Sequence, residues 1–323
     1  MPTASQNRPP RTVCVLGGTG FVGSRVAAHL AAAGYELRLP TRHPERARHL
    51  KVLPNARLLR ADVHDPATLA QLLHGCDAVV NLVGILNEKG FDGQGFMHAH
   101  AELARKLVTA CEAADVDKLV QISGLKADAK LGPSHYLRSK GVAEQHIAAA
   151  ERLRWTILQP SVIFGPGDSF LNRFADLLGL IPLAMPLACP DARFAPVHVD
   201  DVALAVAKAL EDPLTDGRTL EICGPEAYSL RELVQMISQA TGKKRLIIGL
   251  PDSLARLQAR ILERLPGKLF TMDNYRSLSV PSICRSNGCA ELGIRPRSLE
   301  LNLAASLGLP PGSSRNSPAA QPR

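Results

Sequence analysis

Three side chains in the middle of the chain have the chemical types and the spacing of a proton-transfer site. Tyr136 and Lys140 stand at positions i and i+4, so both lie on one face if this segment is helical. An ammonium beside a phenol favours the phenolate and lowers the tyrosine pKa from about 10 towards the range useful for general acid–base catalysis. The hydroxyl of Ser123, which precedes them, can orient a carbonyl or an alcohol. These are the candidate catalytic residues; the alternative is a packed tyrosine and a solvated lysine.

A glycine-rich segment near the N-terminus has the pattern of a dinucleotide-binding turn. Gly17, Gly20 and Gly23 form GxxGxxG between a β-branched run and an alanine-rich stretch. In such turns the first glycine permits the tight turn, the second lets the backbone approach a pyrophosphate, and the third lets helix pack on strand. The helix start would supply N–H donors and the positive end of its dipole. A purely structural glycine turn is the alternative.

The second expected strand ends without the acidic residue that usually binds the ribose 2′-hydroxyl of NAD. Arg42 stands there instead, and its guanidinium can bind a 2′-phosphate, with Arg38 and His43 adding positive charge. We therefore predict NADP as the cofactor, with NAD as the alternative if Arg42 is only a solvated loop residue. Asp62, after the third strand, can accept a hydrogen bond from adenine or can cap the next helix.

The hydrophobic pattern predicts a scaffold that brings these groups together. Short β-branched runs alternate with helical stretches, which is typical of a parallel sheet covered by helices on both faces. The expected strands are 12–16, 36–40, 57–59, 78–82, 119–122 and 156–158, with a further strand at 219–222. The expected helices are 21–33, 66–73, 96–114 and 136–150. The fold class is thus α/β, a doubly wound (Rossmann) parallel sheet with a smaller C-terminal mixed α/β substrate domain.

The pattern changes after Pro160, where prolines and glycines crowd a segment with little periodicity that suits loops over a ligand cleft. A strand and a helix follow at 194–210, with Asp200 placed to cap the helix. We assign 11–165 and about 194–225 to the cofactor domain, and 166–193 and about 226–309 to the second domain. The terminal segments 1–10 and 310–323 have the composition of disordered tails.

Composition limits the class of protein. The formal net charge of +8 permits attraction to phosphate groups or an anionic membrane, but aromatic residues make up only 4% and do not interleave with a basic run, so we expect no nucleic-acid binding. No apolar run is long enough to span a bilayer, and the N-terminus is unlike a signal peptide, so we expect a cytoplasmic protein. The seven scattered cysteines suit a reducing compartment and indicate no metal site.

With these motifs the chain resembles the short-chain dehydrogenase/reductase superfamily in its extended or atypical branch, the NAD-dependent epimerase/dehydratase type. The resemblance covers nearly the whole expected folded part. The supporting segments are the glycine loop 17–23, Ser123, the Tyr136 and Lys140 pair, 159–165 and 196–202. A narrower likeness, in segments 136–140, 170–174 and 196–202, is to the Rossmann-fold accessory subunit of respiratory complex I and its bacterial relatives.

The resemblance implies a bound cofactor and leaves turnover open. The cofactor contacts that we expect are Gly17, Thr19, Gly20, Phe21, Val22, Gly23, Arg42, Asp62, Val63, Leu82, Val83, Gly84, Tyr136, Lys140, Pro160 and Val162. The function is an NADP-dependent oxidoreductase or a cofactor-holding protein linked to quinone metabolism. A sugar-nucleotide epimerase or dehydratase, or a non-enzymatic accessory subunit, is the alternative. Segment 168–190 is apolar with Arg173 as its basic residue, which favours an apolar substrate.

Segment 251–265 has the pattern of an amphipathic helix with a basic stripe. Leucine and isoleucine recur at helical spacing, while Arg256, Arg260 and Arg264 recur every fourth residue. This pattern fits contact with an anionic membrane surface or with an acidic partner such as a respiratory complex. The alternative is an ordinary surface helix that packs its leucines on the second domain. His198 is expected to be a packed histidine rather than a base, and Asp201 part of a cap.

Overall fold

Strands and helices alternate through the first of two units in the computed structural model, which describes residues 11–310. Within these residues the first unit comprises 11–160, Val199–Cys223 and Cys284–Arg295, and the second comprises Ser161–His198, Gly224–Ile283 and 296–310. The terminal tails that we expected to be disordered lie outside the described residues, apart from Pro310.

The first unit is built on a seven-stranded sheet in the order β11-β6-β5-β4-β1-β2-β3, in which every neighbouring pair is parallel. Its strands are β1 (Thr12–Leu16), β2 (Glu36–Thr41), β3 (Ala56–Arg60), β4 (Ala78–Asn81), β5 (Lys118–Ile122), β6 (Arg154–Pro160) and β11 (Arg218–Ile222). The strand order reverses direction between β1 and β4, the position at which doubly wound sheets bind ligands. The predicted fold class is confirmed.

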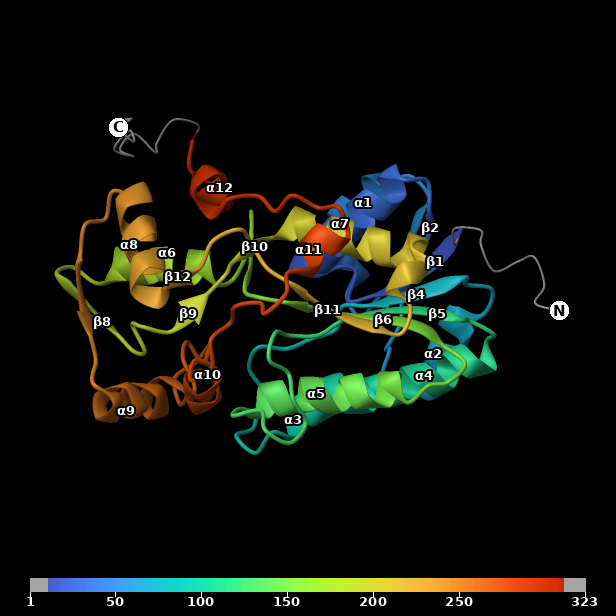
Figure 1. The fold of residues 1–323 in the computed structure, drawn as a ribbon, viewed down its shortest axis with the longest axis horizontal. Coiled ribbons are helices and arrows are strands. Elements are labelled where there is room, and N and C mark those ends of the chain that lie inside the picture. Colours follow the sequence, from blue (N-terminus) through green and yellow to red (C-terminus); the bar gives the residue numbers. More distant parts are fainter. Residues whose placement is uncertain (1–10, 311–323) are drawn as a thin grey trace. The chain divides into compact units, whose positions relative to one another are not determined.

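Helices cover both faces of this sheet (Figure 1). On one face lie α1 (Phe21–Ala32), α7 (Val199–Glu211) and α11 (Gly288–Glu291); on the other lie α2 (Pro66–Leu73), α4 (Leu103–Ala113) and α5 (His135–Ala148). Shorter helical segments are η1 (Pro44–Val52), α3 (Gln94–Phe96), the π-helix η2 (Met97–Glu102) and η3 (Pro213–Thr215). Because both faces are covered, β4 and β5 are buried along their whole length.

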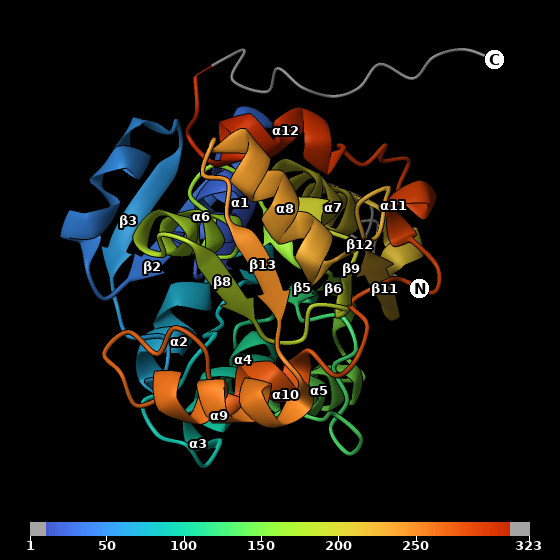
Figure 2. The same cartoon turned by 90° about the vertical axis from the view of Figure 1, so that its left-hand side faces the viewer.

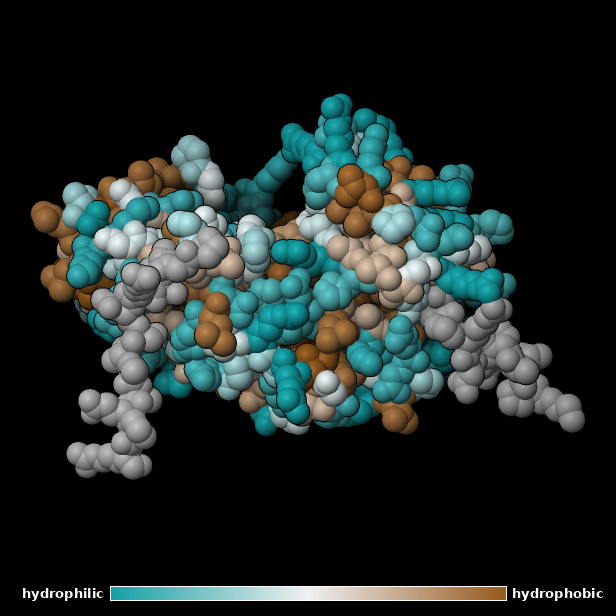
Figure 3. Space-filling model, turned by 90° about the horizontal axis from the view of Figure 1, so that it is seen from above, coloured by the Kyte–Doolittle hydropathy of each residue, from teal (hydrophilic) through white to brown (hydrophobic). Residues whose placement is uncertain are grey.

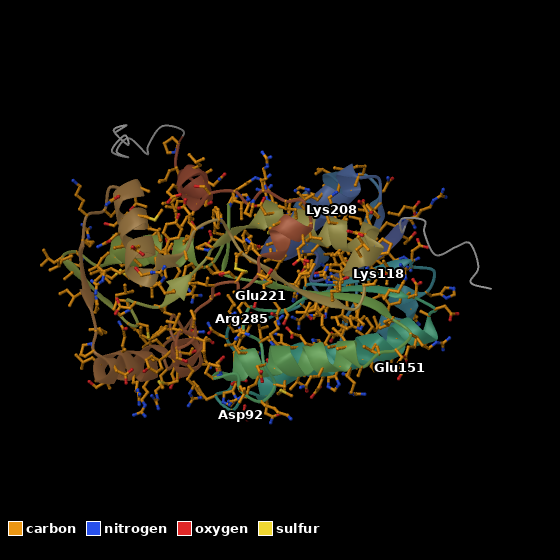
Figure 4. The ribbon with its side chains drawn as sticks, viewed as in Figure 1. Asp92, Lys118, Glu151, Lys208, Glu221 and Arg285 are labelled. Atoms are coloured by element: carbon orange, nitrogen blue, oxygen red, sulfur yellow. A yellow bond between two sulfur atoms is a disulfide. The ribbon has the colours of Figure 1, made fainter. Side chains whose placement is uncertain are left out.

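The edge of this sheet at β11 is tied to the segment 284–295. Glu221 accepts hydrogen bonds from Lys126 and from the backbone N–H of Arg285, and Figure 4 shows Glu221 and Arg285 side by side. A disulfide joins Cys223 to Cys284. The scattered cysteines were expected to suit a reducing compartment, but the fold pairs two of them that are 61 positions apart in the sequence.

The second unit has short strand pairs and its own core (Figure 2). Its strands are β7 (Ile163–Phe164), β8 (Ala184–Leu187), β9 (Arg193–Phe194), β10 (Val197–His198), β12 (Tyr228–Ser229) and β13 (Leu246–Gly249). Its helices are α6 (Leu171–Leu180), α8 (Leu230–Ala240), α9 (Asp252–Leu262), α10 (Met272–Ser277) and α12 (Leu299–Ser306). Figure 3 shows hydrophobic residues gathered on the surface at the left-hand end of this unit.

Two local expectations differ from the structure. The segment expected to be irregular contains α6, whose start is stabilised by Asp168: this buried carboxylate accepts hydrogen bonds from the N–H groups of Phe170 (2.8 Å) and Leu171 (2.6 Å). Asp200 does not cap α7, because the helix already begins at Val199; its carboxylate forms an ion pair with Arg25 at 3.7 Å. Within residues 11–310 no helix is both long and apolar enough to cross a bilayer.

Candidate active site

Most of the predicted site residues lie at the carboxyl ends of neighbouring parallel strands in the first unit. They come from the ends of six strands and together line one edge of the sheet: Gly17 after β1, Arg42 after β2, Asp62 and Val63 after β3, Leu82, Val83 and Gly84 after β4, Ser123 after β5, and Pro160 at the end of β6. Ligands of open α/β sheets bind at this edge, near the point where the strand order reverses.

The glycine loop fits closely against the strand end beside it. Gly17 has a φ of +74°, which side chains rarely adopt, and a Cβ at this position would lie 3.0 Å from the carbonyl carbon of Leu82. A Cβ on Gly23 would lie 2.1 Å from the Gly17 oxygen, so α1 can pack on the loop only with glycine there. A Cβ on Gly20 would meet little, the nearest atom being the Gly17 oxygen at 3.4 Å.

The start of α1 has the features of an anion site. Gly20 is the N-cap residue, and no side chain caps the helix, so the first N–H groups of α1 lack a side-chain acceptor. Phe21 and Val22 form the first turn and are half-buried, and Thr19 of the loop is also half-buried. The loop and the helix start thus offer N–H donors next to the ends of β1 and β4.

Tyr136 and Lys140 lie in the first two turns of α5, next to the ends of β4 and β5. The Tyr136 hydroxyl is 3.2 Å from the position that a Cβ on Gly124 would take, directly after Ser123. The Lys140 ammonium donates to the carbonyl oxygens of Ile122 (3.1 Å) and Val83 (3.5 Å). A Cβ on Gly84 would lie 3.3 Å from Lys140 Nζ, so the lysine also lies against the loop after β4.

Burial controls the ionisation of both residues. It raises the pKa of Tyr136 to about 12 and lowers the pKa of Lys140 to about 8, the latter against the opposing influence of Glu144. The lowered tyrosine pKa that we expected is therefore not found in the protein alone. Lys140 lies on the same helical face as Tyr136, as predicted. Its ammonium, however, donates to backbone carbonyl oxygens, and burial of the phenol raises the pKa of Tyr136.

His100 of η2 also belongs to this site, and no motif in the sequence pointed to it. Its Nε2 accepts a hydrogen bond from the N–H of Ile85 (3.2 Å), and its Nδ1 is 2.8 Å from the Ser139 hydroxyl, which in turn donates to the Tyr136 carbonyl oxygen (2.8 Å). These bonds assign the tautomer with the proton on Nδ1. Burial and the charge of Lys140 lower the pKa of His100 to about 2.

Glu144 is a second residue that the sequence reasoning missed. It lies one helical turn after Lys140, and its carboxylate accepts hydrogen bonds of 2.8 and 3.0 Å from the Gln159 side-chain amide. Burial raises the pKa of Glu144, while the Ser123 hydroxyl and Gln159 oppose the rise. Ser123 Oγ is buried beside Glu144, and within the described residues it forms no hydrogen bond of normal geometry.

Basic side chains lie near the end of β2, together with the Glu45 carboxylate, which forms an ion pair with Arg60 at 3.1 Å. The Arg42 side chain is exposed, and its charge contributes with those of His98 and Lys106 to a lowered pKa of His64, whose largest cause is burial. Asp62 accepts a hydrogen bond from the His64 N–H (3.0 Å), while Asp65 caps α2 through the Thr68 N–H (2.8 Å). The helix cap is therefore Asp65, and Asp62 organises the turn after β3.

The remaining predicted residues belong to other environments. His198 of the second unit is buried, with its ring edge against Phe164 at a centroid distance of 5.2 Å, as expected of a packed histidine. Val162 also belongs to the second unit, where its carbonyl accepts a hydrogen bond from the Val197 N–H (3.0 Å). Asp201 is buried in the first turn of α7.

Comparison with known proteins identifies the type of domain. The family model for NAD(P)H-binding matches residues 17–169, from the glycine loop to beyond the end of β6. Residues 17–169 therefore match NAD(P)H-binding domains, which supports a nicotinamide cofactor. Solved structures of sugar-nucleotide epimerases share the fold of this chain.

Relatives extend the likeness beyond the NAD(P)H-binding domain. The mitochondrial NADH dehydrogenase (ubiquinone) 1 alpha subcomplex subunit 9 of Mus musculus is 29% identical over 299 residues, covering 89% of this chain and 77% of the mouse protein. A ceramide reductase of Caulobacter vibrioides is 27% identical over 249 residues, 74% of each chain. The UDP-glucuronic acid 4-epimerase of Bacillus cereus has the same fold, with a TM-score of 0.73 at 19% identity, covering 92% of this chain and 98% of the epimerase.

Proposed function

We propose that this chain is an NADP(H)-dependent oxidoreductase that reduces a carbonyl or quinone group of an apolar substrate. The observation that carries the proposal is the meeting of the glycine loop with Ser123, Tyr136 and Lys140 at one edge of the parallel sheet. Proton-transfer groups placed beside a dinucleotide site suit hydride chemistry better than a purely structural role.

The residues at this edge suit an extended dinucleotide. The side-chain-free surfaces at Gly17 and Gly20 and the N–H groups of α1 would hold the pyrophosphate. Arg42 would bind a 2′-phosphate, since no acidic residue ends β2. Lys140, whose ammonium already lies between the loop after β4 and the end of β5, would reach ribose hydroxyls.

The protein's own groups would handle the proton. A bound nicotinamide supplies or accepts the hydride. With a pKa of about 12, Tyr136 is protonated at neutral pH and would donate its proton to the substrate oxygen, which Ser123 Oγ would hold by a hydrogen bond. A protonated phenol supports reduction of a carbonyl rather than oxidation of an alcohol.

An apolar substrate is supported by the chemistry of the second unit and by the relatives. Arg173 is the basic residue of segment 168–190, and its guanidinium donates to the Leu269 carbonyl oxygen at 3.0 Å. Two relatives are named for ceramide and for ubiquinone, which are both largely apolar molecules. A sugar nucleotide would instead need cationic groups over its diphosphate.

The proposal is tested by mass spectrometry of the cofactor retained by the purified protein, followed by hydride-transfer assays with NADPH and a panel of quinones and long-chain ketones. We expect turnover that Tyr136→Phe abolishes with little change in NADPH affinity, because the ring is retained. Lys140→Ala should reduce both turnover and affinity. Undiminished turnover in Tyr136→Phe would contradict the assigned role.

A second candidate function is a non-enzymatic, NADPH-holding accessory subunit of a respiratory complex. The likeness to alpha subcomplex subunit 9, which covers 89% of this chain, favours it. Retained NADPH without turnover of any substrate in the panel, together with co-purification of respiratory-complex subunits from the native host, would support this candidate over the oxidoreductase.

A further inference from the structure

Helix α9 in the second unit leaves its large apolar side chains in solvent. Leu254, Leu257 and Ile261 are 48%, 52% and 54% exposed, and Leu265 just after the helix is 46% exposed. The buried residues of α9 are instead Ala255 and Ala259. The alternative, a surface helix that packs its leucines on the second domain, is therefore not what the structure shows, because the helix packs through its small residues.

The exposed apolar side chains form one stripe that arginines border. With about 100° between successive residues of a helix, Leu254, Leu257 and Ile261 fall within about 60° of one another. Arg260 and Arg264 fall beside this stripe, and Arg256 lies farther round the helix, between Ala259 and Arg260. The helix thus presents a packed face, a basic face and an apolar face in sequence around its axis, as interfacial helices do.

Contacts within the second unit fix this helix in place. The Gln258 side-chain amide donates to the Pro186 carbonyl oxygen of β8 (3.2 Å), and Glu263 accepts a hydrogen bond from the Met272 N–H at the start of α10 (3.0 Å). Figures 1 and 2 both show α9 beside α10, and Figure 2 shows that α9 follows β13. The apolar stripe is therefore presented by a structured helix.

The charge of this region favours an anionic partner. Residues 243–276 contain eight lysines or arginines against three acidic residues. Arg256 forms an ion pair with Asp252 at 2.7 Å and lies over the Tyr275 ring, whereas Arg260 and Arg264 form no ion pair with any residue in 11–310. Arg264 donates to the Arg260 carbonyl oxygen (2.6 Å).

We propose that α9 docks on an anionic lipid membrane. The stripe formed by Leu254, Leu257, Ile261 and Leu265 enters the boundary between headgroups and acyl chains, and Arg260 and Arg264 bind lipid phosphates beside it. A lipid surface fits both observations at once, because it offers an apolar layer next to a layer of negative charge. The inference does not depend on the redox activity.

Flotation of the full chain with vesicles tests the proposal. We expect binding to phosphatidylcholine vesicles containing phosphatidylglycerol, weakening with salt, and little binding to pure phosphatidylcholine. Each basic residue near such a surface contributes about five-fold in partitioning, so the double variant Arg260→Gln, Arg264→Gln should bind roughly 25-fold more weakly. Leu257→Ser with Ile261→Ser should abolish binding at high salt as well as at low salt.

Matched controls separate the helix from general charge and hydrophobicity. Arg46→Gln with Arg48→Gln removes two exposed arginines from η1, and Leu301→Ser removes a side chain that is 86% exposed on α12; both should bind like the parent. Absence of binding to anionic vesicles at low ionic strength would overturn the proposal, as would equal loss in the controls. A dimer in solution that Leu257→Ser dissociates would assign the stripe to a second copy instead.

Discussion

At neutral pH the Tyr136 phenol is protonated and the His100 imidazole is neutral, because both groups are desolvated. The network of Ile85, His100, Ser139 and the Tyr136 carbonyl uses both nitrogens of the neutral ring, so protonation would break the bond that Nε2 accepts. His100 therefore orients the start of α5 by a fully used set of hydrogen bonds. It is a positioning residue for Tyr136 rather than a proton donor to substrate.

The buried imidazole makes stability depend on pH. Its pKa is about 2 in the folded protein and about 6.5 when unfolded, so the unfolded chain takes up a proton that the folded chain excludes. Stability should be unaffected above pH 6.5 and should fall as the pH drops below it, by up to about 1.4 kcal/mol per pH unit from this group. Urea unfolding followed by the fluorescence of Trp155, the single tryptophan, measures the slope.

The His100→Gln variant is the comparison for this slope. At pH 7 its free energy of unfolding should be lower than that of the parent. Between pH 6.5 and 5 its free energy of unfolding should fall by less than that of the parent does. Parallel pH profiles for the two proteins would show that His100 titrates normally in the fold.

Cofactor preference should depend on Arg42. A charge-assisted hydrogen bond to a phosphate contributes about 1.5–3 kcal/mol, so Arg42→Ala should raise the NADPH dissociation constant by roughly ten-fold to a hundred-fold and leave that for NADH nearly unchanged. Titration calorimetry measures both constants. Arg46→Ala, which removes another exposed arginine of the same region, is the control and should change neither. Equal affinities for the two cofactors in the parent would refute the NADP assignment.

At the scale of elements, hydrophobic periodicity predicted longer strands and helices, including α9 within segment 251–265, and failed for the shortest elements. β1 and α2 have the predicted bounds, since a buried parallel strand and a capped amphipathic helix are each determined by local residues. The two-residue strands β7, β9, β10 and β12 carry too short a pattern to be recognised. α6 was not predicted, because Asp168, which accepts hydrogen bonds at the start of this helix, lies among glycines and prolines that are typical of loops.

The residues of the candidate site also fall into two groups, those that local sequence spacing predicts and those that it does not. The glycine loop, Ser123, Tyr136 and Lys140 could be located from the sequence because their chemistry depends on fixed local spacing. His100 and Glu144 could not, because their roles depend on contacts across the sheet edge and on burial. The return of residues 284–295 to β11 also depends on long-range contacts such as Arg218 with Glu291.

The two ends of the glycine loop should respond differently to the same substitution. Gly23→Ala would place a methyl group 2.1 Å from the Gly17 oxygen, where only backbone can move, and should lower stability by about 1–3 kcal/mol. Gly20→Ala meets no such obstacle and should change stability by less than about 1 kcal/mol, yet weaken cofactor binding by occupying the approach to the pyrophosphate. Thermal melts and titrations on both variants check this; a cofactor affinity unchanged in Gly20→Ala would move the pyrophosphate away from this loop.

At the scale of the whole molecule, the chain leaves the first unit at Cys223 and returns at Cys284, and the disulfide joins these two points. Closing a long loop restricts the unfolded chain, so replacing both cysteines by serine should lower the free energy of unfolding by roughly 2–5 kcal/mol. Denaturant melts of the variant and the oxidised parent measure the difference. Cys111→Ser, a buried free thiol, is the control for the substitution itself.

The same bond makes residues 224–283 a covalently closed ring that carries α9. A protease that cuts once inside this ring cannot release either piece while the disulfide is intact. On a gel without reductant the nicked chain should migrate close to its full mass, and with reductant it should separate into two fragments. A single cut beside α9 can therefore break the backbone on one side of this helix, while the disulfide still holds the two fragments together as one molecule.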